Sequence, residues 1–389
     1  MRRPRLLILS RNLPPLTGGM ERLMNHAITQ LGLKYELTVI GPRGCRQYLD
    51  PAVRCYEAPG NGLLGYLIST VPVLLFSLFR ERPAAILAGS GVAAPLARLA
   101  AVLSRRPWIV LVHGLDLVVA SRLYRAIALP AIRRARLVIA NSRNTAALAC
   151  EIGVVAQRVQ VIPPGVEFPP PPATPGRFRD TFALANRPVL LSVGRLVPRK
   201  GLTPFVARAM PEILARHPDA VLVIVGEAPR QALFHGVAEQ ASIGTAATRA
   251  QVAQRVVFAS RVTDELLAAA YYDADLLVFP VLDVPGDVEG FGMVAVEAAA
   301  YGLPTFGFRS GGLKDAVVDH QTGELLPAGD YSGLAAAICA RLDDRGDDRY
   351  REHCLAHAAR HDWANYGTQL RSALREAINS GSGKATPPQ

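Results

Sequence analysis

The chain has 389 residues, of which half are hydrophobic and 19% are charged. This composition excludes a disordered protein, and the length exceeds one ordinary hydrophobic core, so we expect two domains. The charge is uneven: residues 1–165 carry 21 basic against 7 acidic residues, a net +14, while the remainder carries 22 against 25, a net −3.

The first half of the chain alternates short apolar runs with helical patterns. This alternation is typical of a parallel, doubly wound α/β sheet whose strands are covered by helices on both faces. The runs that we expect to be strands are residues 5–10, 35–41, 84–89, 108–114, 136–142 and 159–165.

Residues 63–79 form a run of 17 residues without a charge. The run contains Pro72 and is short for a bilayer core of about 30 Å. One interpretation is a membrane-spanning helix. We favour a helix that covers the sheet and is flanked by Arg80 and Arg82, either buried or lying at an interface, and we expect most of it to be buried.

The prolines of residues 166–176 cannot join a helix or a central strand, so this segment is predicted to be a linker. It separates an N-terminal domain, residues 1–165, from a C-terminal domain, residues 177–360. A helix is predicted over residues 361–379, and residues 380–389 have the composition of a flexible tail. The strands expected in the second half are residues 188–195, 220–226, 255–260, 274–281 and 303–308.

Two glycine-containing turns follow strands in the first half. Gly18 and Gly19 open a helix, where backbone amides without a helical partner suit a phosphate, although a plain tight turn is the alternative. The later run GSGVAA, residues 89–94, matches a dinucleotide-binding pattern, with Asp116 as its acidic residue. Because this run does not belong to the first strand-helix unit, we favour close helix packing as the reason for its glycines.

A basic pair opens the second domain. Arg195 comes at the end of an expected strand, where α/β sheets place their ligands, and Lys200 follows five residues later. Lysine is rare in this arginine-rich chain, so Lys200 suggests a point charge selected for phosphate. A solvated basic turn is the alternative.

Two glutamates eight residues apart, Glu289 and Glu297, surround the turn into a helix. The helix begins near Phe291, Gly292 and Met293, whose amides lack partners inside it. One glutamate with these amides suits a sugar, and the other suits the two hydroxyls of a ribose. The alternative is an exposed helix with two solvated acids.

The combination of Gly18–Gly19, His113 in HGLD, the G-R-x-x-x-x-K run and the E-x7-E pair resembles the retaining GT-B glycosyltransferases of family 4. The likeness extends from the first strand to residues 361–378, which look like the C-terminal helix that returns to the N-terminal domain. It implies two Rossmann-like domains that face each other across a cleft, and a hexosyltransferase acting in envelope polysaccharide or glycolipid synthesis.

The resemblance also implies roles for the residues above. The turn of Gly18 and Gly19, together with Arg195 and Lys200, would bind the diphosphate of a nucleotide sugar. Glu289 with the amides of Phe291, Gly292 and Met293 would bind the donor sugar, and Glu297 the ribose. His113 would contact the reacting sugar; the residues with catalytic roles are His113, Glu289, Arg195 and Lys200.

The segment RVVFASRV, which includes Val262, resembles the part of the family that seats the nucleotide base. Ser260 stands where the family commonly has glycine. The motif DVEGFGMVAVEA is similar to bacterial mannosyltransferases that use GDP-mannose, but enzymes that use UDP-sugars share most of it. The sequence therefore does not decide between a guanine and a uracil base in the donor.

We expect no metal and no cofactor. The five cysteines and the His and Asp residues lack metal-ligand spacing. Arg195, Lys200 and the Gly19 amide would stabilise the departing diphosphate in place of a metal. The resemblance implies retention of the anomeric configuration, with the acceptor attacking from the face that the diphosphate leaves.

The basic half suggests an anionic partner, which would be a membrane surface or a lipid diphosphate beside a glycan or lipid-linked acceptor. We therefore expect a cytoplasmic, peripheral protein on the inner face of the plasma membrane. The alternative is an arginine-rich composition without a functional meaning. Nucleic acid is not expected, because no nucleic-acid-binding motif accompanies the arginines. The alternative functions are a nucleotide-sugar epimerase of GT-B fold and, on the GSGVAA run alone, an NAD(P)-binding oxidoreductase.

Overall fold

The structure is a computed structural model that describes residues 3–168, 170, 174–227, 238–260, 262–345 and 348–379. The chain divides into two compact units. Unit 1 comprises the residues up to Gly165 together with those from Trp363 onward, and unit 2 runs from Val166 to Asp362. The predicted flexible tail, residues 380–389, and linker residues 169 and 171–173 lie outside the described residues.

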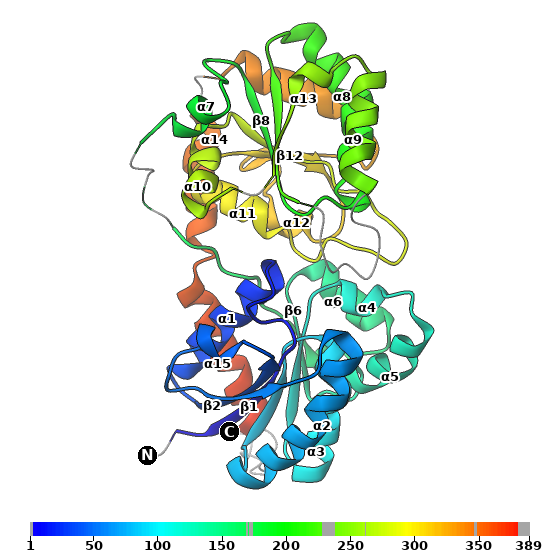
Figure 1. Ribbon diagram of the computed structural model, residues 1–389, viewed down its shortest axis with the longest axis vertical. Coiled ribbons are helices and arrows are strands. Elements are labelled where there is room, and N and C mark those ends of the chain that lie inside the picture. Colours follow the sequence, from blue (N-terminus) through cyan, green and yellow to red (C-terminus); the bar gives the residue numbers. More distant parts are fainter. Residues whose placement is uncertain are drawn as a thin grey trace, which may run out of the picture. The chain divides into compact units, whose positions relative to one another are not determined.

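Each unit contains one parallel sheet flanked by helices, which confirms the α/β class predicted from the sequence (Figure 1). The strands of unit 1 are β1 (Arg5–Leu9), β2 (Glu36–Pro42), β3 (Arg54–Ala58), β4 (Ala85–Ala88), β5 (Trp108–Val112), β6 (Leu137–Ala140) and β7 (Val159–Val161). Its helices are α1 (Gly19–Gly32), α2 (Gly62–Glu81), α3 (Ala94–Ser104), α4 (Leu115–Val118), α5 (Arg122–Ile132), α6 (Arg143–Glu151) and α15 (Trp363–Asn379).

Unit 2 repeats this architecture. Its strands are β8 (Val189–Val193), β9 (Val221–Val225), β10 (Val256–Ser260), β11 (Leu276–Phe279), β12 (Thr305–Phe308) and β13 (Gly323–Leu326). Its helices are α7 (Arg177–Thr181), α8 (Leu202–Arg216), α9 (Ala238–Arg249), α10 (Asp264–Asp273), α11 (Met293–Ala300), α12 (Leu313–Ala316), α13 (Tyr331–Asp343) and α14 (Arg349–Ala359).

The two sheets share one topology. The strand order is β3-β2-β1-β4-β5-β6-β7 in unit 1 and β10-β9-β8-β11-β12-β13 in unit 2, with all pairs parallel. The order reverses between β1 and β4 in the first sheet and between β8 and β11 in the second. Open parallel sheets bind ligands at the carboxyl ends of the strands beside such a reversal. The loops after these four strands are therefore where a site is expected.

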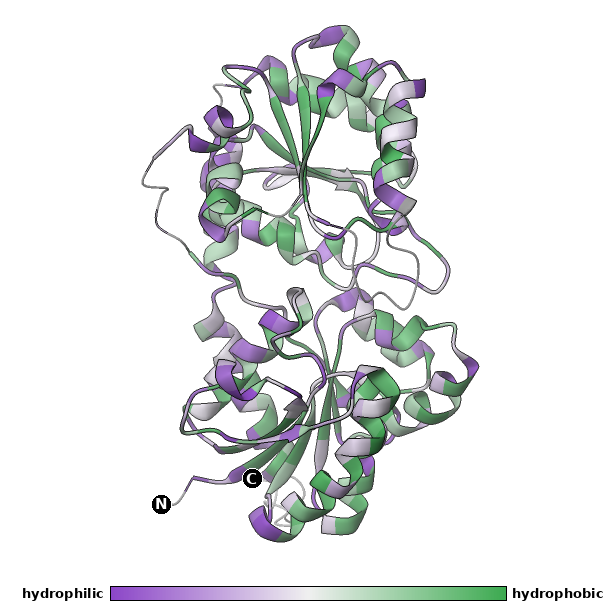
Figure 2. Cartoon of the chain, in the orientation of Figure 1, coloured by the Kyte–Doolittle hydropathy of each residue, from purple (hydrophilic) through white to green (hydrophobic). Residues whose placement is uncertain are grey.

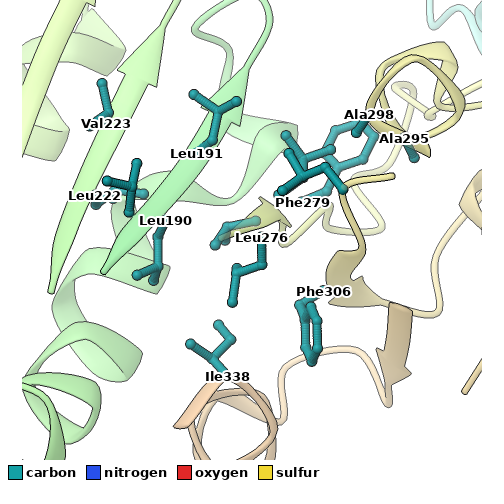
Figure 3. Packing of buried hydrophobic residues seen from close by; sticks show 14 of the residues in the cluster. Leu190, Leu191, Leu222, Val223, Leu276, Phe279, Ala295, Ala298, Phe306 and Ile338 are labelled. Atoms are coloured by element: carbon teal, nitrogen blue, oxygen red, sulfur yellow. The ribbon is translucent and has the colours of Figure 1, made fainter. Parts of the chain in front are cut away.

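Strands that are buried on both faces explain why the sequence pattern was informative. In β1, Leu6 and Ile8 join the core on one face of the sheet, while Leu7 and Leu9 join the core on the other. Unit 2 has a single continuous core. Figure 3 shows Leu276 and Phe306 from neighbouring strands packed toward Ile338 of α13.

Two strands, β3 and β13, were not predicted. Both lie at an edge of their sheet. Edge strands are less completely buried, so their sequences, RCYEA and GELL, carry charged residues and lack a continuous apolar run.

Helix α15 belongs to unit 1, where it lies beside α1 (Figure 1). Its buried residues Tyr366, Leu370 and Leu374 join the core beneath α1. At its first residue, the Trp363 ring stacks on His26 of α1 with centroids 3.9 Å apart.

The expectation that residues 63–79 are mostly buried is wrong. Helix α2 buries one stripe against the sheet, which includes Tyr66, Thr70 and Leu74. It is the one helix of the described residues that is long and apolar enough to cross a membrane, and only 22% of its most apolar window is buried. The sequence predicted the helix but not its orientation, because an apolar helix has the same composition whichever side it buries.

Candidate functional site

The strand-order reversal in unit 2 brings one member of the predicted basic pair, Lys200, together with the first glutamate. Arg195 and Lys200 follow β8, and Glu289 lies in the loop between β11 and α11. Lys200 Nζ donates a hydrogen bond to Glu289 Oε2 over 2.8 Å. The same ammonium lies 4.0 Å above the ring centroid of Phe279, the last residue of β11, so it also makes a cation–π contact.

Arg199 completes the group of charges, and the sequence analysis missed it. Its guanidinium donates to Asp287 Oδ1 over 2.9 Å and pairs with Glu289 Oε2. Only 9% of Arg199 is exposed. The available signal was its position, directly before Lys200 and six residues after the end of β8, which lies at the ligand edge of the sheet.

Burial and the neighbouring charges shift the pKa values of Lys200 and Glu289 in opposite directions. Burial lowers the pKa of the Lys200 ammonium to about 8, although Glu289 opposes the shift. Burial would raise the pKa of Glu289, but the charges of Lys200 and Arg199 outweigh it and lower that pKa to about 2. At neutral pH the glutamate is therefore an anion and the lysine a cation that titrates close to the physiological range.

The Glu289 carboxylate keeps an acceptor for a ligand. Both cations bind Oε2, so Oε1 has no hydrogen-bond partner within the described part of the chain. An ionised carboxylate oxygen accepts hydroxyl hydrogen bonds well. The arrangement thus fixes Glu289 through one oxygen and leaves the other for a hydroxyl-rich molecule.

Arg195 lies apart from this buried network. Its side chain is exposed and makes no ion pair with the residues that the structure describes. Its charge nevertheless contributes to the lowering of the Lys200 pKa. The basic pair therefore has one buried member held by protein carboxylates and one exposed member available to an anion.

Two glycines fix the backbone at this site. Gly201 has a φ of 69°, and a Cβ there would lie 2.0 Å from the Pro280 carbonyl oxygen, so the turn after Lys200 closes against the β11 loop only with glycine. Gly292 caps the N-terminus of α11 with a φ of 90°. The helix begins at Met293, so Phe291, Gly292 and Met293 stand at its N-terminal end as predicted.

Glu297 does not join the Glu289 network. It lies on α11 and accepts a hydrogen bond from the Tyr271 hydroxyl of α10 over 3.1 Å. The two glutamates therefore have different protein partners, and the prediction that they contact different parts of a ligand stays a prediction.

The predicted base-seating segment shows an unusual backbone. Ser260, the last residue of β10, has a φ of 44°, and the register with β9 shifts beside it. This is a left-handed conformation that glycine adopts without strain, which explains why glycine is common there in the family. Val262 follows in a half-buried position after the carboxyl end of β10.

Asp273 and Asp275 form a D-x-D sequence before β11 that the sequence analysis overlooked. Asp273 accepts hydrogen bonds from the backbone amides of Gly176 and Phe178, over 2.9 and 3.0 Å. Asp275 pairs with Arg179 and Arg345. These carboxylates tie α7 to the sheet. Across the described ranges, no three His, Cys, Asp or Glu side chains form a metal-binding group.

In unit 1, helix α1 begins at Gly19, with Gly18 as its N-cap. An acid that the prediction ignored lies beside this turn: Glu21 accepts a hydrogen bond from the Asn12 amide over 3.0 Å. A Cβ on Gly18 would lie 2.6 Å from Glu21 Oε2. The turn is therefore less electropositive than its two glycines suggested.

His113 follows β5 and is buried. Its Nε2 lies 2.9 Å from the Gly89 carbonyl oxygen, which only accepts, so Nε2 carries a proton. Nδ1 is buried without a hydrogen-bond partner in the described residues. In the neutral ring this nitrogen is an acceptor, fixed in direction by the bond on the opposite side of the imidazole.

The GSGVAA run serves packing, the interpretation that we favoured. A Cβ on Gly89 would lie 2.6 Å from Ser10 Oγ, and one on Gly91 would lie 2.4 Å from the Tyr124 hydroxyl. Asp116 accepts a hydrogen bond from the His113 backbone amide over 3.1 Å. The carboxylate that a dinucleotide would need is thus part of the local fold.

Sequence comparison places both halves of the chain in related families. Residues 17–168 match the family described as Glycosyltransferase Family 4, and residues 177–369 match Glycosyl transferases group 1. A GDP-mannose-dependent α-(1-6)-phosphatidylinositol monomannoside mannosyltransferase of Mycolicibacterium smegmatis is 30% identical, over 98% of this chain and 99% of its own. A D-inositol 3-phosphate glycosyltransferase of Nocardia farcinica is 32% identical over 64% of this chain and 56% of its own.

Solved structures share the fold. Anabaena HepE in complex with UDP and glucose has a TM-score of 0.78 at 23% identity, covering 96% of this chain and all of that one. Sucrose-phosphate synthase from Thermosynechococcus elongatus has a TM-score of 0.76 at 23% identity, covering 97% of this chain and all of that one. Together with the relative that matches along its whole length, these similarities show that the chain belongs to the group 1, family 4 glycosyltransferases of GT-B fold and is a hexosyltransferase that uses a nucleotide sugar.

Proposed function

We propose that this enzyme transfers a mannosyl group from GDP-mannose to a hydroxyl of a lipid-linked acceptor, with retention of configuration and without a metal ion. The buried Lys200–Glu289–Arg199 group carries the proposal, because it presents a fixed carboxylate oxygen beside fixed cations. The donor and acceptor classes follow the Mycolicibacterium smegmatis relative, which matches nearly the whole chain. Membership of a transferase family favours transfer over epimerisation or NAD(P) chemistry.

In the proposed reaction, the bond between sugar C1 and the diphosphate oxygen breaks, and its electron pair stays on that oxygen. Arg195 and Lys200 stabilise the developing charge as preorganised cations. The acceptor oxygen forms the new bond to C1 on the face that the diphosphate leaves, and its proton passes to the departing diphosphate.

The remaining residues orient the donor in this proposal. Glu289 Oε1 accepts hydrogen bonds from sugar hydroxyls, and Glu297 accepts those of the ribose. In unit 1, the Nδ1 atom of His113 accepts a hydrogen bond from a sugar hydroxyl. We further propose that the basic unit 1 keeps the enzyme peripheral at the cytoplasmic face of an anionic membrane, where a lipid-linked acceptor lies.

The donor is tested by thermal denaturation of the full chain with GDP, UDP and ADP and with their monophosphates. A ligand at a hundredfold excess over its Kd stabilises the folded state by about 2.7 kcal/mol. We expect the largest increase in Tm with GDP and GDP-mannose, and we expect Lys200→Ala to lose the advantage of the diphosphate over the monophosphate. No increase with any nucleotide would overturn the proposal.

Stereochemistry is tested on the product. GDP-α-mannose and a phosphatidylinositol mannoside acceptor should give an α-linked product, read from the anomeric one-bond C–H coupling by NMR. A β-linked product would overturn retention while leaving the donor assignment intact.

A further inference from the structure

Helix α2 turns its apolar side outward. Its buried stripe, Tyr66, Thr70, Leu74 and Ser77, includes two hydroxyl side chains that donate back to carbonyls of the same helix. The opposite stripe is Leu64, Ile68, Leu75 and Phe79, and Phe79 is 81% exposed. A surface helix of a globular protein ordinarily shows the reverse, with polar residues outward.

The apolar surface continues onto two neighbouring helices. Helix α3 packs against both α2 and α5. In Figure 2 much of the ribbon of these helices is coloured as hydrophobic. The exposed large apolar side chains are Leu99, Val102 and Leu103 on α3 and Leu123 and Ile127 on α5. Apolar patches of this kind on a soluble protein mark a surface that meets another molecule or a membrane.

The charge around this surface has one sign. Residues 59–150 contain 11 arginines and only two acids, Glu81 and Asp116. Both acids are buried, at 3% and 9% exposed. Most of these arginines are exposed. A segment with exposed cations and no exposed carboxylate matches a partner that carries negative charge, and two copies of this face would repel each other.

A pocket at the C-terminal end of α2 adds a place for an anionic head group. It has a volume of about 540 Å³ and is lined by four arginines, Arg5, Arg46, Arg54 and Arg80, and by one acid, Glu81, which pairs with Arg54 and Arg80. Tyr56, which also lines it, packs edge-on against Phe76 of α2 with ring centroids 5.9 Å apart. The guanidinium group matches the geometry of a phosphodiester. Arg80 and the contact of Tyr56 with Phe76 place the pocket beside α2.

We propose that the outer face of α2, α3 and α5 is a docking surface for an anionic phospholipid bilayer. Leu64, Ile68, Leu75 and Phe79 enter the boundary between head groups and acyl chains, as the apolar face of an interfacial helix does. The rim arginines and the pocket contact lipid phosphates. This inference deepens the proposed function, since a lipid-linked acceptor lies at the same surface.

The test is co-sedimentation of the full chain with phosphatidylglycerol or phosphatidylcholine vesicles at low and high salt. Salt screens the arginines but not apolar insertion, so the wild type should prefer phosphatidylglycerol and keep part of its binding at high salt. The variant Ile68→Ser/Leu75→Ser/Phe79→Ser should lose at least about 10-fold in binding at both salt concentrations. Leu33→Ser is the control, because Leu33 is 55% exposed at the end of α1, outside this face.

The charge contribution is tested separately. Arg80→Gln/Arg106→Gln should weaken binding to phosphatidylglycerol at low salt several-fold. The control Arg177→Gln/Arg249→Gln removes the same charge from exposed positions of unit 2 and should leave binding unchanged. Equal loss in both double variants would mean that net charge alone drives binding, which would overturn a defined face.

A second measurement detects membrane contact directly and does not depend on a loss of binding, which a misfolded variant would also show. Tryptophan at position 79, in Phe79→Trp, should be quenched by vesicles with brominated acyl chains, while Leu33→Trp should not. Absence of quenching would overturn the proposal. A dimer in sedimentation equilibrium that the triple serine variant abolishes would instead assign the face to a second copy of the chain.

The two proposals fail independently. The triple serine variant should keep the increase in Tm with GDP, because its changes lie far in sequence from the unit 2 network. If no nucleotide stabilises the wild type, the proposed function falls, and vesicle binding still decides whether the α2 face docks on lipid.

Discussion

The carboxyl edges of the two sheets share a strand order and differ in chemistry. Unit 2 gathers charged side chains at its strand-order reversal: Lys200, Arg199, Asp287 and Glu289 are linked and largely buried. At the corresponding edge of unit 1 the structure places tightly packed glycines, the Glu21 carboxylate beside Gly18 and the Nδ1 atom of His113, which has no hydrogen-bond partner in the described residues. One topology thus supports a site for charge and a site for hydroxyls, because the loops and not the strands carry the chemistry.

The largest expected effect tests the charged edge. Lys200→Ala and Arg195→Ala each remove a cation that the developing diphosphate charge would use. Turnover at saturating donor should fall by at least about 10²-fold, the scale for one lost oxyanion donor. Near-normal turnover in either variant would show that the unit 2 charges do not serve the leaving group.

The next effect concerns Arg199, which contacts Asp287 and Glu289. Arg199→Ala leaves Asp287 without its cation and Glu289 with Lys200 alone, so it should lower the free energy of unfolding by about 3 kcal/mol, the low end for a broken buried ion pair. Denaturant unfolding measures it. Arg216→Ala, which breaks the exposed pair with Asp343, is the control and should cost less than about 1 kcal/mol. Equal decreases in the free energy of unfolding for Arg199→Ala and Arg216→Ala would show that the buried ion pairs stabilise the fold no more than the exposed one.

The pKa of Lys200 predicts a pH dependence. A lysine is cationic below its pKa, and burial lowers this one to about 8. The kcat/KM for the donor should therefore fall above pH 8, approaching about tenfold per pH unit, because this ratio reports the free enzyme. Lys200→Arg keeps its charge and should flatten the decline. A decline that persists in Lys200→Arg would assign it to another group.

A smaller effect is expected for His113, which follows β5 in unit 1. His113→Ala removes one neutral hydrogen bond to the sugar, worth about 1 kcal/mol, so kcat/KM should fall about fivefold. The Tm of the variant controls for loss of the contact with Gly89. A decrease as large as that of Lys200→Ala would mean that unit 1 takes part in the chemistry itself.

Removal of metal ions should have the smallest effect. If Lys200 and Arg195 replace a metal, turnover after EDTA treatment should match the untreated enzyme. Activity that is lost and then restored by Mg²⁺ or Mn²⁺ would show that the cations of unit 2 are insufficient.

Features that depend on short-range pattern could be predicted from the sequence. The interior strands are buried on both faces, so they read as apolar runs, and Lys200 and Glu289 follow such strands. Features that depend on tertiary burial could not. Arg199 sits in a basic turn that looks solvated, and only the fold shows its two carboxylate partners.

The same reason explains the errors at the edges and at α2. β3 and β13 are stabilised by one neighbouring strand each, a property of sheet order and not of composition. The outward side of α2 depends on which residues the sheet accepts, and small hydroxyl residues such as Thr70 and Ser77 fill the buried stripe. The role of Glu21 beside Gly18 became visible only when the turn was folded.

The placement of α15 determines the order in which the two units can complete their folds during synthesis. Unit 2 is one uninterrupted stretch of chain, whereas unit 1 needs α15, which leaves the ribosome after all of unit 2. Tyr366, Leu370 and Leu374 complete the core beneath α1, so that core stays open to solvent while unit 2 emerges. Domains usually fold in the order of their synthesis. Here the second unit is the first that can complete its fold, and the nascent first unit exposes apolar surface until α15 has been synthesised.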